Sequence, residues 1–130
     1  LARESGSNLE LENIENHSFL PLESLQTTNN EDFFKSLVKY ESHFQELFQK
    51  ATEKNCRLKY VAQFIDGKAN VSLQEITADH PFYNLEGSDN IVLFFTDRYS
   101  KNPLLIKGAG AGAEVTASGI FADVIRIGNN

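Results

Sequence analysis

The chain has 130 residues, of which 41% are hydrophobic and 23% are charged, which is ordinary for one globular domain. The formal net charge is −6 without any basic run, so nucleic-acid binding is not supported, and no apolar stretch reaches the roughly 20 residues that cross a bilayer. A single cysteine, Cys56, excludes an internal disulfide and fits a reducing compartment, so we expect a cytoplasmic protein with neither nucleic-acid nor membrane partners.

The first thirty residues carry short local signals. Residues 1–6 are typical of the last turn of a helix, with Gly6 as its stop. Apolar and polar residues alternate over residues 9–14, which predicts a half-buried strand. Pro21 and the polar stretch 26–30 predict a loop.

One long helix is predicted over residues 31–54, with Asn29 or Asn30 as its cap. Its apolar residues recur every three or four positions and form a single stripe. The stripe consists of Phe33, Phe34, Leu37, Val38, Phe44, Leu47, Phe48 and Ala51. Such a stripe predicts a helix that packs on the core rather than a binding groove.

A β-hairpin is predicted over residues 57–65 and 68–76, because Asp66-Gly67 suits a two-residue turn in which both residues have positive φ. This turn fixes the register of the two strands. One face then pairs Phe64 with Ala69, Ala62 with Val71 and Tyr60 with Leu73, and the other face pairs Gln63 with Asn70 and Lys59 with Gln74. We therefore expect the first face to be buried and the second to be wet.

The last third of the chain predicts a turn, two strands and a helix. The turn is at residues 79–82, and Gly87 marks a break. Residues 91–95 are apolar on both faces, which predicts a central strand, and residues 104–106 predict a shorter one. Residues 114–127 predict a helix that is apolar on nearly all sides and therefore buried on most of them.

These elements predict an α+β fold in a single domain, residues 1–130. We expect an antiparallel or mixed sheet with the long amphipathic helix packed on one face, plus the C-terminal apolar helix. The chain contains no methionine, so we also expect it to be a piece of a longer polypeptide.

The segment Gly-Ala-Gly-Ala-Gly at residues 108–112 is the strongest candidate for a site. Gly108, Gly110 and Ala113 fit the pattern G-x-G-x-x-G/A between a strand and a helix. A full dinucleotide fingerprint also needs another parallel strand and an acid about 20 residues further on, for which this sequence leaves no room. The segment therefore predicts either a tight loop that touches a ligand held mainly elsewhere or a tight turn that permits close helix packing.

No catalytic or metal-binding group is predicted. The three histidines, His17, His43 and His80, have no metal-like spacing to one another or to Cys56, so we expect surface or structural roles for them.

The sequence resembles the homoserine dehydrogenase family, most closely the bifunctional aspartokinase–homoserine dehydrogenases. The resemblance is carried by residues 79–82 (DHPF), 87–90 (GSDN) and 107–123 (KGAGAGAEVTASGIFAD). Residues 1–6 are similar to the segment that follows the family's Asp-x-x-Arg-Lys motif. Residues 16–56 carry much less of the resemblance.

The resemblance implies an oxidoreductase that interconverts aspartate semialdehyde and homoserine with NADP or NAD in threonine and methionine biosynthesis. It implies that Gly112 contacts the nicotinamide cofactor, that Gly108 and Gly110 shape the loop, and that Thr116 lies nearby. The family's catalytic lysine and substrate carboxylates would precede Leu1. The 130-residue fragment is therefore expected to be inactive alone and to hold no bound cofactor.

The resemblance also implies a homodimer formed through the sheet and a last helix that packs on the rest of the parent enzyme. In the fragment alone we expect this helix to be buried against its own sheet or a second copy. Two alternatives stay open: an amino-acid-binding regulatory module built on the helix at 31–54 and the hairpin, and an oligomerisation domain with no ligand.

Overall fold

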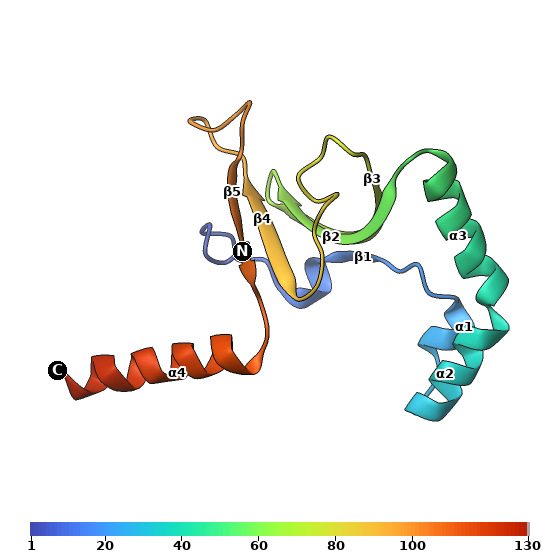
Figure 1. The fold of residues 1–130 in the computed structure, drawn as a ribbon, viewed down its shortest axis with the longest axis horizontal. Helices are drawn as coiled ribbons and strands as arrows, with labels where there is room; N and C mark the ends of the chain where they lie inside the picture. Colours follow the sequence, from blue (N-terminus) through green and yellow to red (C-terminus); the bar gives the residue numbers. More distant parts are fainter. Residues whose placement is uncertain (130) are drawn as a thin grey trace. The chain divides into compact units, whose positions relative to one another are not determined.

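The computed structural model describes residues 1–129 and separates into two compact units, Leu1–Tyr83 and a second that begins at Asn84 (Figure 1). The first unit holds a mixed three-stranded sheet in the order β1-β3-β2, and the second holds an antiparallel two-stranded sheet and the C-terminal helix. The predicted α+β fold is therefore confirmed. That both units belong to a single domain stays a prediction.

The first turn of the chain ends where the sequence predicts. Gly6 has a φ of +89°, and its N–H donates to the carbonyl of Arg3 at 3.0 Å. The N–H of Ser7 donates to the carbonyl of Ala2, also at 3.0 Å. These two bonds form the Schellman motif, in which the residue after the last helical turn adopts a left-handed conformation that favours glycine.

The strand predicted over residues 9–14 is wrong. The segment forms a 3₁₀ turn, Leu11–Asn13, and a short strand follows it, β1 (Glu15–His17). The side-chain oxygen of Asn13 accepts from the N–H of Glu10 at 3.3 Å, so a local hydrogen bond replaces a strand ladder there. β1 pairs in parallel with β3 (Lys68–Ile76).

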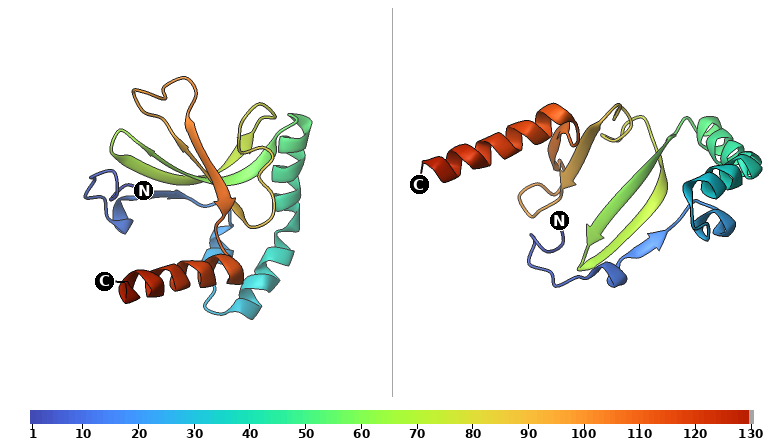
Figure 2. Two further views of the ribbon diagram at one scale, coloured as in Figure 1. Left: turned by 60° about the vertical axis from the view of Figure 1, so that its left-hand side comes forward. Right: turned by 90° about the horizontal axis from the view of Figure 1, so that it is seen from below.

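The long helix predicted over residues 31–54 is two helices, α2 (Asn30–Lys39) and α3 (Glu41–Glu53). They run in different directions on either side of Tyr40, whose φ and ψ are −100° and +22° (Figures 1 and 2). The predicted cap is confirmed, because the side chain of Asn29 accepts from the N–H of Asp32 at 2.9 Å.

A short helix that the sequence did not reveal, α1 (Leu22–Leu25), contacts the chain at the break. Its Glu23 carboxylate accepts from Lys39 Nζ and from the Tyr40 hydroxyl, each at 2.7 Å. Both bonds, that from Lys39 first, lower the pKa of Glu23, so this contribution to stability is present at neutral pH and lost as the pH falls through the lowered pKa. α1 thus holds the chain where one helix ends and the next begins.

Beneath this ion pair, α1 and α2 share a buried polar contact. The hydroxyls of Ser24 and Ser36 lie 2.8 Å apart, and both residues are buried. The Ser36 hydroxyl also contacts the carbonyl of Phe33 at 2.7 Å. Because the buried hydroxyls have partners, small polar residues can fill this contact without a desolvation penalty.

The hairpin formed by β2 (Arg57–Ile65) and β3 has the predicted register throughout. Asp66 and Gly67 have φ values of +50° and +77°, as the two-residue turn requires. The predicted burial of its faces is wrong. The buried residues Val61 and Ile76 lie on the face that was expected to be wet.

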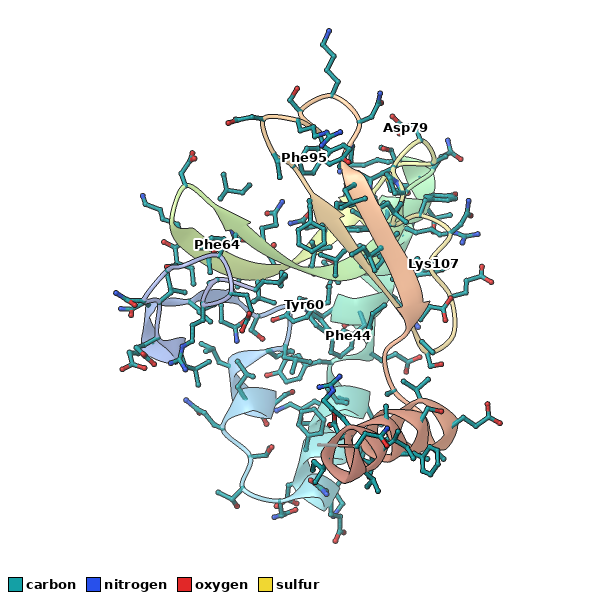
Figure 3. The ribbon with its side chains drawn as sticks, turned by 90° about the vertical axis from the view of Figure 1, so that its left-hand side faces the viewer. Phe44, Tyr60, Phe64, Asp79, Phe95 and Lys107 are labelled. Atoms are coloured by element: carbon teal, nitrogen blue, oxygen red, sulfur yellow. The ribbon has the colours of Figure 1, made fainter. Side chains whose placement is uncertain are left out.

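The opposite face of the hairpin is only partly covered, and Tyr60 remains 50% exposed. The ring of Tyr60 lies 5.7 Å from that of Phe19, which in turn lies 6.5 Å from Phe44 of α3. Figure 3 shows Phe44 and Tyr60 near each other in this cluster. Edge-to-face aromatic contacts therefore join α3 to the sheet without full burial.

We expect Gly67→Ala to lower the free energy of unfolding of the first unit by about 1 kcal/mol, because an alanine at a φ of +77° is strained. A Cβ at this position would meet no atom within 4 Å, so a steric clash does not contribute. Urea denaturation followed by circular dichroism measures the change. An unchanged midpoint would show that the turn relaxes at no cost.

In the second unit, β4 (Asp89–Phe94) pairs with β5 (Leu104–Ala109) and with no other described strand. The prediction of a central strand at residues 91–95 is therefore wrong. β5 is also longer than the predicted 104–106, because its pairing continues through Ala109. A run of apolar residues predicts that a strand is buried, but it does not predict which segment of the protein buries it.

The C-terminal helix, α4 (Ala113–Gly128), is one straight helix after β5 (Figure 2), as predicted. Within the second unit, its predicted burial on the sheet is wrong, since β4 and β5 leave every described residue of α4 exposed. Phe121 is 65% exposed and Ile127 is 77% exposed. Burial against a second copy stays a prediction.

Candidate functional site

The candidate site lies where β5 leads into α4. Gly108 is part of β5 and pairs with Asn90, so the predicted loop begins later than expected, at Gly110. The N–H of Gly110 donates to the carbonyl of Ser88 at 3.2 Å. Gly112 then caps α4, and its carbonyl accepts from the N–H of Thr116 at 3.1 Å.

The three glycines of this segment have different physical reasons to be glycine. Gly112 has a φ of +138° and a ψ of +155°, a region that only glycine occupies readily. Gly110 has no positive φ, but a Cβ there would lie 1.6 Å from the side-chain nitrogen of Asn90. Gly108 has neither constraint, because its φ is not positive and a Cβ would meet no atom within 4 Å.

The start of α4 offers backbone donors to a ligand. The first N–H groups of an α-helix have no carbonyl one turn earlier to accept from them, and Gly112 brings no side chain that could cap them. A Cβ on Gly112 would meet nothing within 4 Å, so the space beside it is open. Glu114 in the first turn places a carboxylate at the positive end of the helix dipole.

These features fit the edge of a cofactor site. An uncharged amide or carbonyl could accept hydrogen bonds from the exposed N–H groups, whereas the carboxylate of Glu114 disfavours a phosphate at the same place. Gly110, Gly112 and Thr116 lie together along this turn, and Gly108 lies one step back in the strand. The sequence placed Asn90 only within the segment 87–90 that carries the resemblance and indicated no role for it, because its place beside Gly110 depends on the pairing of β4 with β5.

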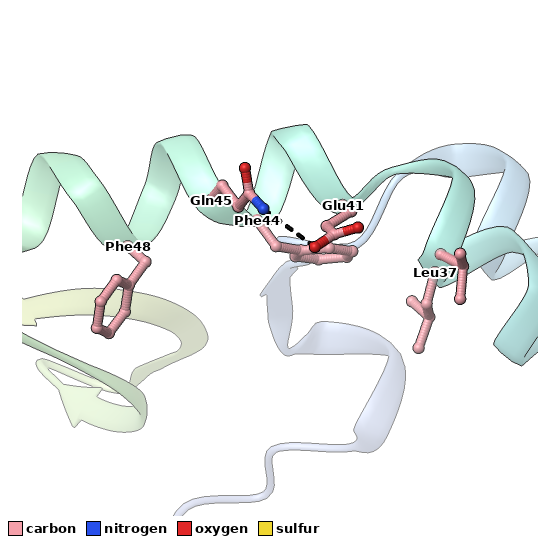
Figure 4. A pocket seen from close by; sticks show the side chains of 6 residues that line it. Leu37, Glu41, Phe44, Gln45 and Phe48 are labelled. Atoms are coloured by element: carbon pink, nitrogen blue, oxygen red, sulfur yellow. Dashed lines mark hydrogen bonds between the residues drawn. The ribbon is translucent and has the colours of Figure 1, made fainter.

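A second candidate lies in the first unit, where α2 and α3 line an open groove of about 790 Å³ (Figure 4). Its walls are Leu37, Val38, Glu41, Phe44, Gln45 and Phe48. The side-chain amide of Gln45 donates to the Glu41 carboxylate at 3.0 Å. The charged residue among those that line this groove is the acidic Glu41, which repels the carboxylate of an amino-acid ligand, so the groove gives no support to an amino-acid-binding module.

The other titratable groups have local structural contacts. His43 Nε2 lies 2.9 Å from the carbonyl of Phe19, and the Nδ1 atom of His80 accepts from the N–H of Phe82 at 3.1 Å. Cys56 is half-buried. In the described part of the chain, no group of three or more His, Cys, Asp or Glu side chains is arranged to hold a metal ion. Over residues 1–129, no helix has both the length and the apolar character needed to cross a membrane.

Comparison with known proteins identifies the class to which this fold and glycine turn belong. Residues 1–125 match the model of the homoserine dehydrogenase family. The chain belongs to the homoserine dehydrogenase family.

Individual relatives agree with this assignment. A chloroplastic bifunctional aspartokinase/homoserine dehydrogenase of Daucus carota is 40% identical over 129 residues, which cover 98% of this chain and 14% of the relative. A homoserine dehydrogenase of Schizosaccharomyces pombe is 37% identical over 122 residues, which cover 88% of this chain and 32% of the relative.

Among solved structures, a Candida auris protein described as of unknown function superimposes with a TM-score of 0.83 at 39% identity. The match covers 99% of this chain and 37% of that one. The chain therefore spans between 14% and 37% of the length of these three proteins.

Proposed function

We propose that this chain is the C-terminal part of the catalytic and dimerisation region of a homoserine dehydrogenase. The parent enzyme would interconvert aspartate semialdehyde and homoserine with NADP or NAD, in the cytoplasm, on the route to threonine and methionine. The observation that carries the proposal is the turn at Gly112, where a backbone conformation reserved for glycine opens directly onto the start of α4. Membership of the family supports the assignment.

In this proposal Gly112 contacts the nicotinamide cofactor, and Gly108, Gly110 and Thr116 form the turn around that contact. The cofactor supplies the hydride chemistry when it is bound. The chain's own contribution is a set of backbone N–H groups in a fixed direction and the absence of a side chain at Gly112. The choice between NADP and NAD would depend on the dinucleotide domain.

We expect the pure 130-residue chain to show no oxidation of homoserine. By the family resemblance, the catalytic lysine and the substrate carboxylates precede Leu1, so the chain would hold one edge of the site without its reacting groups. A spectrophotometric assay of NADP and NAD reduction at 340 nm is the measurement, with the full-length enzyme as the positive control. Turnover by the purified fragment would contradict this assignment of roles.

The exposed apolar surface of α4 supports a partner. Its exposed side chains include Val115, Ile120, Phe121, Val124, Ile125 and Ile127. Soluble monomers rarely leave so continuous an apolar surface uncovered. We therefore propose that the rest of the parent enzyme covers α4, that the sheet forms the homodimer, and that the isolated fragment self-associates.

An oligomerisation domain without any ligand is the competing function, and the same exposed helix favours it. Measuring the cofactor affinity of the full-length enzyme distinguishes the dehydrogenase proposal from the oligomerisation proposal. A substitution at Gly112 that weakens cofactor binding supports the dehydrogenase proposal. Unchanged affinity and turnover would support oligomerisation alone.

A further inference from the structure

We propose that Asn90 is a positioning residue that fixes the glycine turn and so sets the direction of the backbone at Gly112. The proposal rests on the function proposed above, since it concerns the same turn. Asn90 lies outside the glycine segment and, in this proposal, controls the geometry of that segment. The residue touches the turn by packing, and no contact between it and the cofactor is invoked.

The first observation is that residues 88–90 hold the turn at successive points. Asn90 pairs with Gly108 across the two strands, and the carbonyl of Ser88 accepts from the N–H of Gly110. One residue earlier in β5, Lys107 Nζ lies 3.5 Å from a carboxylate oxygen of Asp89 (Lys107 is labelled in Figure 3). The end of β5 is thus fixed through its backbone and through an ion pair.

The second observation is that the Asn90 side chain occupies the space beside Gly110. A Cβ on Gly110 would lie 1.6 Å from Nδ2, 2.4 Å from Cγ and 3.1 Å from Oδ1 of Asn90. Gly110 does not have a positive φ, so the backbone itself would accept an alanine. An alanine at Gly110 therefore requires the exposed side chain of Asn90 to leave its present place beside the turn.

The third observation is the short distance in sequence between this contact and the start of α4. Only Ala111 separates Gly110 from Gly112. A displacement of Gly110 must therefore be absorbed within one residue or passed on to Gly112. Because Gly112 is a glycine, its φ and ψ can change readily, so a displacement passed on to it alters the direction of the backbone at the start of α4.

The test is a double-mutant cycle in the full-length enzyme, with Asn90→Ala, Gly110→Ala and the combined variant. Gly128→Ala, at the far end of α4, is the control, since a Cβ there also meets nothing within 4 Å and the residue lies outside the glycine turn. We expect Gly110→Ala to raise the KM for NADPH or NADH about 10-fold, because small displacements of a positioning contact are costly. At saturating cofactor, kcat should change by less than about 2-fold, since the reacting groups are elsewhere.

The combined variant provides the decisive comparison. Removing the Asn90 side chain also removes the clash, so we expect the double variant to have a KM close to that of Asn90→Ala alone, and well below the product of the two single effects. If Gly110→Ala does not fold but the double variant does, the steric contact is equally supported. Multiplicative effects, or a Gly110→Ala variant with the same KM as Gly128→Ala, would overturn the inference, as would a double variant that does not fold.

A parallel measurement on Gly112→Ala separates this inference from the proposed function. If Gly112→Ala weakens cofactor binding while the Asn90 and Gly110 variants do not, only the positioning role fails. If Gly112→Ala also leaves the KM for the cofactor unchanged, the proposed contact itself fails.

Discussion

Replacing Gly112 by alanine in the full-length enzyme is expected to raise the KM for NADPH or NADH more than any other single change in this turn. The residue has a φ of +138° and a ψ of +155°, and an L side chain in that region is strained by about 1–3 kcal/mol. If the turn relaxes to relieve this strain, the N–H groups at the start of α4 change direction. A loss of that size corresponds to a roughly 5- to 150-fold weaker interaction.

Gly128→Ala, at the end of α4 and outside the glycine turn, is the control for this experiment. Both substitutions add one methyl group where a Cβ meets no atom within 4 Å, and only Gly112 has a positive φ. The measurement is initial-rate kinetics with varied cofactor, together with circular dichroism to establish that both variants fold. Equal KM values for the two variants would show that the conformation of Gly112 does not matter to cofactor binding.

The second large effect is expected in the first unit, where Ile76→Ala should lower the free energy of unfolding by about 2–5 kcal/mol. Ile76 is 5% exposed at the end of β3, and a truncated side chain there leaves a cavity that a packed core fills poorly. The measurement is urea denaturation of the 130-residue chain, compared by midpoint and slope.

Ile65→Ala is the matched control, since Ile65 lies on the same hairpin and is 60% exposed. Removal of its side chain should change stability by less than about 0.5 kcal/mol, as is usual for surface positions. Similar losses for the two variants would mean that the burial of Ile76 does not govern the stability of this unit.

The two helices of the first unit show where a local pattern stops being sufficient. The spacing of apolar residues over 31–54 predicts helix correctly on both sides of Tyr40. At the interruption, the Tyr40 hydroxyl donates a hydrogen bond to Glu23, which lies 17 residues earlier. The spacing of apolar residues within the helix cannot predict that contact.

The hairpin shows the difference between what local sequence determines and what tertiary packing determines. Asp66 and Gly67 are the turn, so the register follows from two adjacent residues and could be predicted in full. Which face is buried depends on what packs against the sheet, and Val61 and Ile76 are buried on the face with more polar residues. Counting apolar residues therefore gave the wrong face.

In the candidate site, the sequence identified the glycine segment and its family resemblance, and it placed the start of the last helix within one residue. Only the structure showed that the three glycines are under different constraints. Gly112 has a positive φ, Gly110 lies against the Asn90 side chain, and Gly108 has neither constraint. Asn90 and Gly110 are 20 positions apart in the sequence and meet only because β4 pairs with β5.

The sequence by itself thus determined the elements whose signals are local: the stop at Gly6, a helix cap at Asn29 or Asn30, the turn at Asp66-Gly67 and the extent of α4. Turn and cap preferences act between neighbouring residues, so a short stretch of sequence contains them completely. The break at Tyr40, the buried face of the hairpin and the role of Asn90 were decided by tertiary structure. Each depends on contacts between distant segments, whose pairing no single stretch of sequence specifies.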